Sequence, residues 1–237
     1  MLTRSIGRFL SWPLGRLAAL IAPTGIPPNF ITWSALFLNL WAGILFAAGR
    51  FAAAGGMMVL AGLCDLLDGP VARRQNRVSV FGGFLDSILD RYADLILFLG
   101  LLVYYTRVNR FLYAVLVGAA MAGAVMVSYA KARAESLVPK FEVGFWDRPE
   151  RLVLMIIGAL LNRMTVVLWL LAFGSNITVI HRILHTWKQM KGVAPPQPLS
   201  RDAARAAELH PASLPHNVQR EIAETRPILT RSAGRGR

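Results

Sequence analysis

Four aspartates lie within one segment, residues 65–90, and apolar segments flank it on both sides. A carboxylate at the centre of a bilayer costs roughly 2.5–3.5 kcal/mol on insertion scales, so a membrane helix carries one only where something compensates that cost. The whole chain of 237 residues has only 13 acidic residues. Their concentration in this segment indicates that the helices carrying them face one another rather than lipid.

The composition supports a membrane protein. Hydrophobic residues make up 55% of the chain, charged residues only 16%, and the mean hydropathy is +0.47. Soluble domains carry about 25% charged residues. The net charge of +13 favours an anionic lipid surface or a phosphorylated substrate as partner, and we expect no nucleic acid. The single cysteine, Cys64, excludes an internal disulfide.

Apolar runs predict an all-α integral membrane fold with six transmembrane helices. Residues 30–48 contain no charge, which suits a span of about 20 residues. The other predicted spans cover residues 51–64 and onward, 81–106, 111–130, 152–161 and 164–180. One long helix is the alternative for the last two. Asp147 and Glu150 flank Arg148-Pro149 like an N-cap and its partner, which predicts a helix start there.

Three segments are predicted along the chain. Residues 1–22 carry arginines on one helical face among leucines and aromatics, which predicts an amphipathic helix lying in the membrane interface, with a signal peptide as the alternative. Residues 28–190 form the predicted six-span catalytic domain. Residues 191–237 are basic and proline-containing, and we expect disorder there.

The distribution of Lys and Arg predicts the orientation. With six spans, one side of the membrane receives most of the basic residues, including Arg73, Arg74 and Arg77. Basic loops remain cytoplasmic. We therefore expect both termini in the cytoplasm, in a prokaryotic inner membrane.

The spacing of the aspartates predicts a metal site. Asp65 and Asp68 are three residues apart and Asp86 and Asp90 are four apart, so each pair lies on one helical face. Two antiparallel neighbours can turn these faces toward each other, and carboxylates so close cannot all stay ionised without cations. Hard oxygen ligands suit Mg²⁺, Mn²⁺ or Ca²⁺, and two such ions can bind a pyrophosphate.

The segment also contains the complete pattern D-x2-D-G-x2-A-R-x8-G-x3-D-x3-D. Its fixed positions are Asp65, Asp68, Gly69, Ala72, Arg73, Gly82, Asp86 and Asp90. The pattern resembles the signature of the CDP-alcohol phosphotransferase (CDP-alcohol phosphatidyltransferase) family, and the resemblance extends over roughly residues 1–190. It implies a metal-dependent enzyme that transfers a phosphatidyl group from a CDP-linked donor, usually CDP-diacylglycerol, to an alcohol and releases CMP.

The resemblance also implies roles for individual residues. Two Mg²⁺ or Mn²⁺ ions would be held by Asp65, Asp68, Asp86 and Asp90. Asp90 would in addition act as general base on the acceptor hydroxyl. The nucleotide would contact Asn29, Asp68, Gly69, Ala72, Arg73 and Gly82.

The remaining polar residues predict the acceptor. Ser128, Lys131, Arg148, Arg151 and Arg182 lie near the expected cytoplasmic ends of the last three spans, with Arg91 as a further member. So many cations beside a pyrophosphate site indicate an acceptor that carries its own phosphate.

Three looser motifs resemble the inositol-phosphate branch of the family: D-S-I-L-D-R-Y-A-D at residues 86–94, S-Y-A-K-A-R-A-E at 128–135 and D-R-P-E-R-L at 147–152. The resemblance makes inositol 1-phosphate the expected acceptor. Where members of that branch have Glu before the Arg-x-x-Arg pair, this chain has Asp147. Glycerol 3-phosphate and another pair of CDP-linked donor and alcohol are alternatives. A divalent-cation transporter is the non-enzymatic alternative. The lipid bilayer is an expected partner, and the resemblance adds a possible homodimer.

Overall fold

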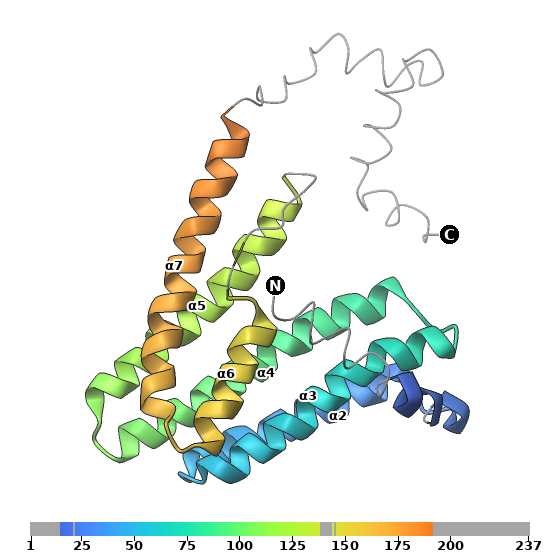
Figure 1. The fold of residues 1–237 in the computed structure, drawn as a ribbon, viewed down its shortest axis with the longest axis horizontal. Coiled ribbons are helices and arrows are strands. Elements are labelled where there is room, and N and C mark those ends of the chain that lie inside the picture. Colours follow the sequence, from blue (N-terminus) through green and yellow to red (C-terminus); the bar gives the residue numbers. More distant parts are fainter. Residues whose placement is uncertain (1–14, 21, 138–143, 145, 192–237) are drawn as a thin grey trace, which may run out of the picture. The chain divides into compact units, whose positions relative to one another are not determined.

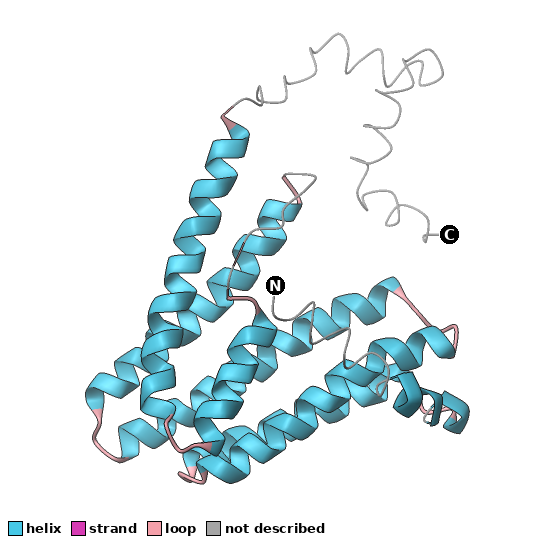
Figure 2. Ribbon diagram, viewed as in Figure 1, coloured by secondary structure: helices cyan, strands magenta, loops and turns pink. Residues whose placement is uncertain are grey.

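The computed structural model describes residues 15–20, 22–137, 144 and 146–191, and these are almost entirely helical (Figures 1 and 2). No strand occurs in the described ranges. The elements after residues 15–20 are η1 (Ala22–Thr24), α2 (Pro28–Ala47), α3 (Phe51–Arg74), α4 (Val80–Arg107), α5 (Phe111–Glu135), α6 (Arg148–Leu160) and α7 (Met164–Met190). The helices α2 to α7 fall where the six spans were predicted.

Consecutive helices alternate in direction (Figure 1), and all of them except α5 and α6 are joined by short turns. Three of these turns contain an asparagine with a positive φ: Asn76 and Asn109 at 53° and Asn162 at 54°. Asparagine adopts this left-handed conformation more readily than most residues, because its short polar side chain bonds locally. Asn162 separates α6 from α7, so the prediction of two separate helices is confirmed and the single long helix is wrong.

Helix packing follows the chain order only in part. α2 packs against both α3 and α4, α5 packs against α4 and α7, and α6 packs against α3 and α7. At one point α2 and α4 approach very closely: a Cβ placed on Gly100 would lie 2.1 Å from the carbonyl oxygen of Gly43. Only glycine fits there, as is usual where membrane helices are in contact.

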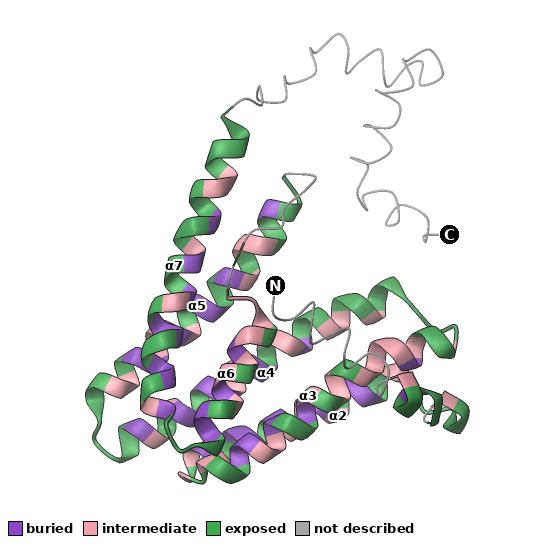
Figure 3. Cartoon of the chain, viewed as in Figure 1, coloured by how far each residue is buried: buried purple, intermediate pink, exposed green. Residues whose placement is uncertain are grey.

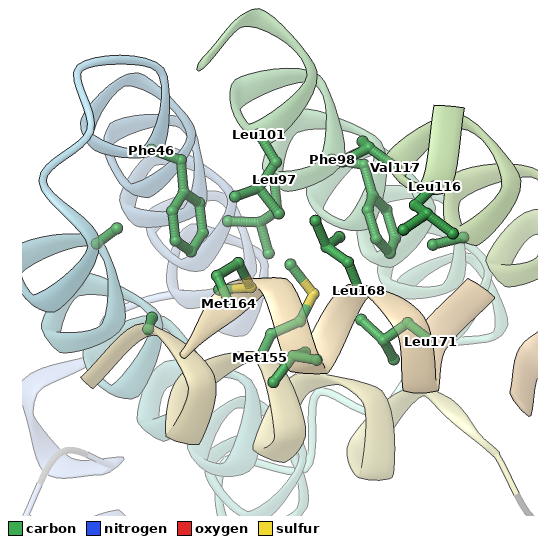
Figure 4. Close-up of a cluster of buried hydrophobic side chains, with 14 of the residues drawn as sticks. Phe46, Leu97, Phe98, Leu101, Leu116, Val117, Met155, Met164, Leu168 and Leu171 are labelled. Atoms are coloured by element: carbon green, nitrogen blue, oxygen red, sulfur yellow. The ribbon is translucent and has the colours of Figure 1, made fainter. Parts of the chain in front are cut away.

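The apolar core lies in one half of the bundle. It contains the end of α2, the end of α4 and the start of α7, with Phe46, Leu97 and Leu168 fully buried against one another (Figure 4). These helix ends meet because the helices alternate in direction. The opposite helix ends therefore meet in the other half, and that half carries the polar residues.

The outer faces of the helices are apolar as well. Phe37, Trp41, Phe173 and Trp187 are each more than 40% exposed, and the buried positions in Figure 3 form stripes on the inner faces. Large exposed apolar areas of this kind fit contact with lipid. Among the described residues, four helices are long and apolar enough to cross a membrane: α2, α3, α5 and α7.

The structure therefore confirms the predicted all-helical membrane protein in this coarser form. α4 carries the acidic residues and α6 has only 13 residues, or about 20 Å, which is less than the roughly 30 Å of a hydrocarbon core. The predicted interfacial helix falls mostly outside the described residues, as does the predicted tail after Lys191.

Candidate active site

The predicted site residues come together because of the alternating helix directions. The start of α2, the end of α3, the start of α4, the end of α5, the start of α6 and the second half of α7 supply them. These helix segments lie toward the same end of the bundle (Figure 1). This arrangement brings acids of α3 and α4 into contact with Arg148 of α6, and Asp147 into contact with cations of α5 and α7.

Asp68 connects α3 to α2. Its Oδ2 accepts a hydrogen bond of 3.1 Å from the hydroxyl of Thr32, and its Oδ1 accepts one of 2.5 Å from the backbone N–H of Gly69. Both oxygens of this half-buried carboxylate are therefore held in place by hydrogen bonds. Thr32 lies one helical turn after Asn29, so the same face of α2 serves the acid and the predicted nucleotide contact.

Arg148 connects the acids of α3 and α4. Its Nη2 lies 3.0 Å from Asp65 Oδ2 and its Nη1 lies 2.8 Å from Asp90 Oδ1. A single guanidinium thus bridges carboxylates from both acidic helix faces. These faces point toward each other, as the spacing predicted. The three side chains are 17–19% exposed, so the cluster is largely withdrawn from solvent.

The donor chemistry of the site fits divalent ions. The carboxylate of Asp86 repels those of Asp65 and Asp68, and also that of Asp90 one turn further along α4. The cluster therefore requires positive charge, and Arg148 supplies part of it in this structure. Among the described residues, no three Asp, Glu, His or Cys side chains surround one point closely enough to ligate an ion.

The first of two cavities lies on the α2 side of the acids. It is lined by Pro28, Asn29, Thr32, Asp68, Gly69, Ala72, Arg73, Arg77, Val78, Ser79, Gly82, Gly83 and Asp86. All six residues predicted to contact the nucleotide are among them. Ser79 caps α4 by accepting a 2.9 Å hydrogen bond from the N–H of Gly82, and a Cβ on Gly82 would lie 3.6 Å from Asn29 Oδ1. Because Gly82 has no side chain, this side of the cavity stays open.

The second cavity lies on the α5 and α7 side. It is lined by Asp90, Arg91, Asp94, Val127, Ser128, Lys131, Asp147, Arg148, Pro149, Glu150 and Arg182. Four of the five residues predicted to bind the acceptor phosphate line it, as does Arg91. Asp90 belongs to this cavity and Asp86 to the first, so the acidic cluster borders both.

Arg151 is the predicted acceptor residue that does not reach this cavity. It is only 1% exposed, and its Nη2 forms a 2.6 Å ion pair with Asp94 Oδ2. Its Nη1 donates a 3.3 Å hydrogen bond to the carbonyl of Trp146. We therefore assign Arg151 to anchoring the start of α6 on α4 and remove it from the predicted acceptor site.

Three contributors were not among the predicted site residues: Thr32, Asp94 and Asp147. Asp94 lies four residues after Asp90, so the helical repeat could have placed it on the same face. Asp147 occupies the predicted N-cap position. Among the described residues of α6, however, no backbone N–H donates to its carboxylate. The carboxylate instead faces Arg182 and Lys131, from helices distant in sequence, which no local pattern indicates.

Comparison with known proteins agrees with this geometry. Residues 26–186 match the CDP-alcohol phosphatidyltransferase family. The chain is 34% identical over 173 residues to an archaetidylinositol phosphate synthase of Methanothermobacter thermautotrophicus, covering 70% of this chain and 86% of that protein. It is 32% identical over 225 residues to a phosphatidylinositol phosphate synthase of Streptomyces avermitilis, covering 88% of each.

Solved structures extend the similarity to the fold. The crystal structure of the Mycobacterium tuberculosis phosphatidylinositol phosphate synthase with CDP-DAG bound superimposes with a TM-score of 0.70 at 27% identity, covering 77% of this chain and 97% of that one. A second structure of that enzyme, in complex with manganese and citrate, gives the same TM-score and covers 92% of the crystallised chain. The predicted family is thereby confirmed: this chain belongs to the CDP-alcohol phosphatidyltransferase family.

Proposed function

We propose that this protein transfers the phosphatidyl group of CDP-diacylglycerol to a phosphorylated alcohol, with inositol 1-phosphate as the best candidate, and releases CMP. The observation that carries the proposal is the acidic cluster with a cavity on each side. One cavity contains every residue predicted to contact the nucleotide, and the other is lined by Lys131, Arg148 and Arg182. Relatives that make archaetidylinositol phosphate and phosphatidylinositol phosphate support this choice of acceptor.

The reaction proceeds at the acidic cluster that borders both cavities. The acceptor hydroxyl oxygen attacks the phosphorus that carries the diacylglycerol, and a new P–O bond forms. The bond from this phosphorus to the bridging oxygen breaks, and CMP leaves with that oxygen. The hydroxyl proton passes to a carboxylate of Asp90, which lines the acceptor cavity as a general base must.

Asp65, Asp68, Asp86 and Asp90 would hold two divalent ions, Mg²⁺ or Mn²⁺. Bound there, such ions neutralise the pyrophosphate and polarise the reacting oxygens. The manganese complex of the mycobacterial relative supports a divalent metal for this family. On the protein side, the hydrogen bonds from Thr32 and Gly69 fix Asp68 in one orientation, which prepares one ligand in advance.

The nucleotide binds in the first cavity. Asn29, Gly69, Ala72, Arg73 and Gly82 contact the cytidine and its phosphates. Small residues at three of these positions let the ligand approach the backbone. A Cβ on Gly69 would lie 3.5 Å from Nη1 of Arg73, so this guanidinium extends over Gly69 toward the same space. A cation in that position suits a phosphate.

The membrane arrangement completes the proposal. α2 to α7 serve as six spans, with α4 and α6 shielded by the four more apolar helices. Both termini and the site face the cytoplasm of a prokaryotic inner membrane, because the basic residues concentrate at that end. Residues 1–22 lie in the interface, residues 28–190 form the catalytic domain, and residues 191–237 form a separate tail. A homodimer is a possible assembly.

A release assay tests the proposed reaction. The purified protein is supplied with CDP-diacylglycerol, Mg²⁺ and one acceptor at a time: inositol 1-phosphate, glycerol 3-phosphate, inositol or serine. We expect CMP release with inositol 1-phosphate only. Release with glycerol 3-phosphate instead would keep the chemistry and change the acceptor. Release with inositol or serine alone, or with none of the four, would contradict the proposal.

One variant tests whether the acceptor's phosphate binds in the second cavity. Arg182→Ala removes a cation that lines the second cavity and is absent from the first. We expect the acceptor KM to rise while the donor KM stays nearly constant. Equal increases in both would place the effect outside the acceptor cavity.

A further inference from the structure

Asp147 places a negative charge in the cavity where the acceptor's phosphate is expected. Its Oδ1 lies 2.6 Å from Nη2 of Arg182, and its Oδ2 lies 3.6 Å from Nζ of Lys131. The two oxygens of one carboxylate thus face two separate cations. Two oxygens of a phosphate would bind the same pair in the same way.

Arg182 cannot move to meet a ligand elsewhere. Its side chain is 1% exposed, and its Nη1 donates a 2.5 Å hydrogen bond to the carbonyl of Val127. Gly144 lies against the guanidinium so closely that a Cβ on it would clash. Any anion that binds Arg182 from the cavity must therefore take the position that Asp147 occupies, and Asp147 is the more mobile partner because its side chain is 37% exposed.

Asp147 has another favourable position within reach. It is the N-cap residue of α6, with extended backbone angles of φ −74° and ψ 172°. An N-cap aspartate ordinarily accepts a hydrogen bond from a backbone N–H two or three residues on. Pro149 has no backbone N–H, so a rotated Asp147 side chain would accept a hydrogen bond from the N–H of Glu150. The helix N-terminus also attracts negative charge, which lowers the cost of this rotation.

We propose that Asp147 is a specificity-determining residue that competes with the acceptor's phosphate for Lys131 and Arg182 and turns toward the start of α6 when that phosphate binds. This inference rests on the proposed function. A phosphomonoester carries up to two negative charges and three acceptor oxygens, so it displaces a single carboxylate. An alcohol without phosphate has no anionic group to bind the two cations, so Asp147 keeps its contacts with both. The residue thus selects phosphorylated acceptors.

A structural role for Asp147 predicts the opposite result. If the carboxylate only held Arg182 in place, removing its charge would weaken phosphate binding. If it competes, removing its charge strengthens phosphate binding. The sign of one measured change therefore separates the two roles.

The variant that tests this is Asp147→Asn, because asparagine caps helices as well as aspartate does while lacking the charge. Binding of inorganic phosphate is measured by calorimetry in EDTA, and phosphate inhibition of CMP release is measured with the complete reaction. We expect phosphate affinity to rise about tenfold, the ratio that one modest charge-assisted hydrogen bond supplies. The acceptor KM should fall by a similar factor and the donor KM should not change.

Two further variants serve as controls. Glu135→Gln removes one negative charge from an exposed side chain one turn after Lys131 and should leave phosphate affinity unchanged. Lys131→Gln removes one of the two cations and should weaken phosphate binding. If Glu135→Gln tightens binding as much as Asp147→Asn does, the effect is one of general charge and the inference is overturned.

A second substitution protects the test against misfolding. Asp147→Ser also retains a capping side chain and lacks the charge. Unaltered or weaker phosphate binding by both folded variants overturns the inference. Failure of the proposed function gives a different pattern: phosphate binding tightens in the variants, but no phosphorylated acceptor yields CMP.

Discussion

Arg148 Nη1 lies 2.8 Å from Asp90 Oδ1, so the predicted general base is paired with a predicted acceptor-binding cation. The same guanidinium reaches Asp65 at 3.0 Å on the neighbouring helix. Arg148 thus pairs with two of the four proposed metal ligands in this structure and supplies part of the positive charge that they require. A divalent ion on the same carboxylates would supply the charge that Arg148 provides here, and Arg148 would then be available to the acceptor cavity that it lines.

Replacement of Arg148 should make stability depend on metal. Arg148→Gln leaves two largely buried carboxylates without their cation, and breaking a buried ion pair costs about 3–5 kcal/mol. For a chain of this size we expect the melting temperature in EDTA to fall by about 6–20 °C. Saturating Mn²⁺ should restore most of the loss. Thermal unfolding in detergent, with and without Mn²⁺, measures both values.

The exposed Arg133 provides the matched control, because Arg133→Gln should change neither value by more than a degree or two. Equal destabilisation of Arg148→Gln in EDTA and in Mn²⁺ would show that the ion does not replace the guanidinium.

Asp90→Asn should abolish turnover while preserving the fold. A positioned general base contributes about 10²–10⁴-fold to a rate, so we expect kcat to fall by at least about a hundredfold. The CMP-release assay measures it, and circular dichroism checks the helix content. Because Asp90 is also a proposed metal ligand, the assay is repeated at increasing Mg²⁺. Recovery of full activity at high Mg²⁺ would assign Asp90 to metal binding alone.

The ion pair between Asp94 and Arg151 should contribute to stability rather than to acceptor binding. Arg151 is 1% exposed and pairs with Asp94 at 2.6 Å. Arg151→Met leaves a buried carboxylate behind and should lower the free energy of unfolding by about 3–5 kcal/mol. Only the longer contact with Arg148, at 3.6 Å, then remains to Asp94. Adding Asp94→Leu removes that carboxylate and should recover a large part of the loss. Thermal unfolding of the single and double variants measures the coupling between them.

The corresponding change at an exposed position, Arg133→Met, should cost less than about 0.5 kcal/mol. A double variant as unstable as the sum of both single variants would show that the two side chains act independently.

The contact between α2 and α4 should not tolerate any side chain at Gly100. A Cβ there would lie 2.1 Å from the carbonyl oxygen of Gly43, and helix backbones cannot yield as a flexible side chain can. Gly100→Ala should therefore destabilise the protein by about 1–3 kcal/mol or more. Gly118 lies in α5, where an added Cβ would have no neighbour within 4 Å, so Gly118→Ala should be neutral or slightly stabilising. Melting temperatures of the two variants check this contrast.

Much of this protein's structure can be predicted from the sequence, because the features that determine it lie within short segments. Uncharged runs of membrane length predict the helices, since every backbone group must be satisfied within the segment. The spacing of Asp65, Asp68, Asp86 and Asp90 predicts two acidic faces, because residues three or four apart share a side of a helix. The same short segment carries the family pattern, so the reaction class follows from it as well.

The tertiary structure decided how the charges are paired. Asp147 meets Arg182 across 35 residues of chain, Asp94 meets Arg151 across 57, and Asp65 meets Arg148 across 83. A list of cations near the helix ends cannot distinguish the buried anchor Arg151 from the cavity-lining Arg148, because the two lie only three positions apart. Both guanidiniums reach Asp94. Arg148 also pairs with Asp65 and Asp90, whereas the buried Arg151 bonds to the carbonyl of Trp146. The packing of α3, α4 and α7 around the start of α6 therefore determines which charge serves stability and which can meet a ligand.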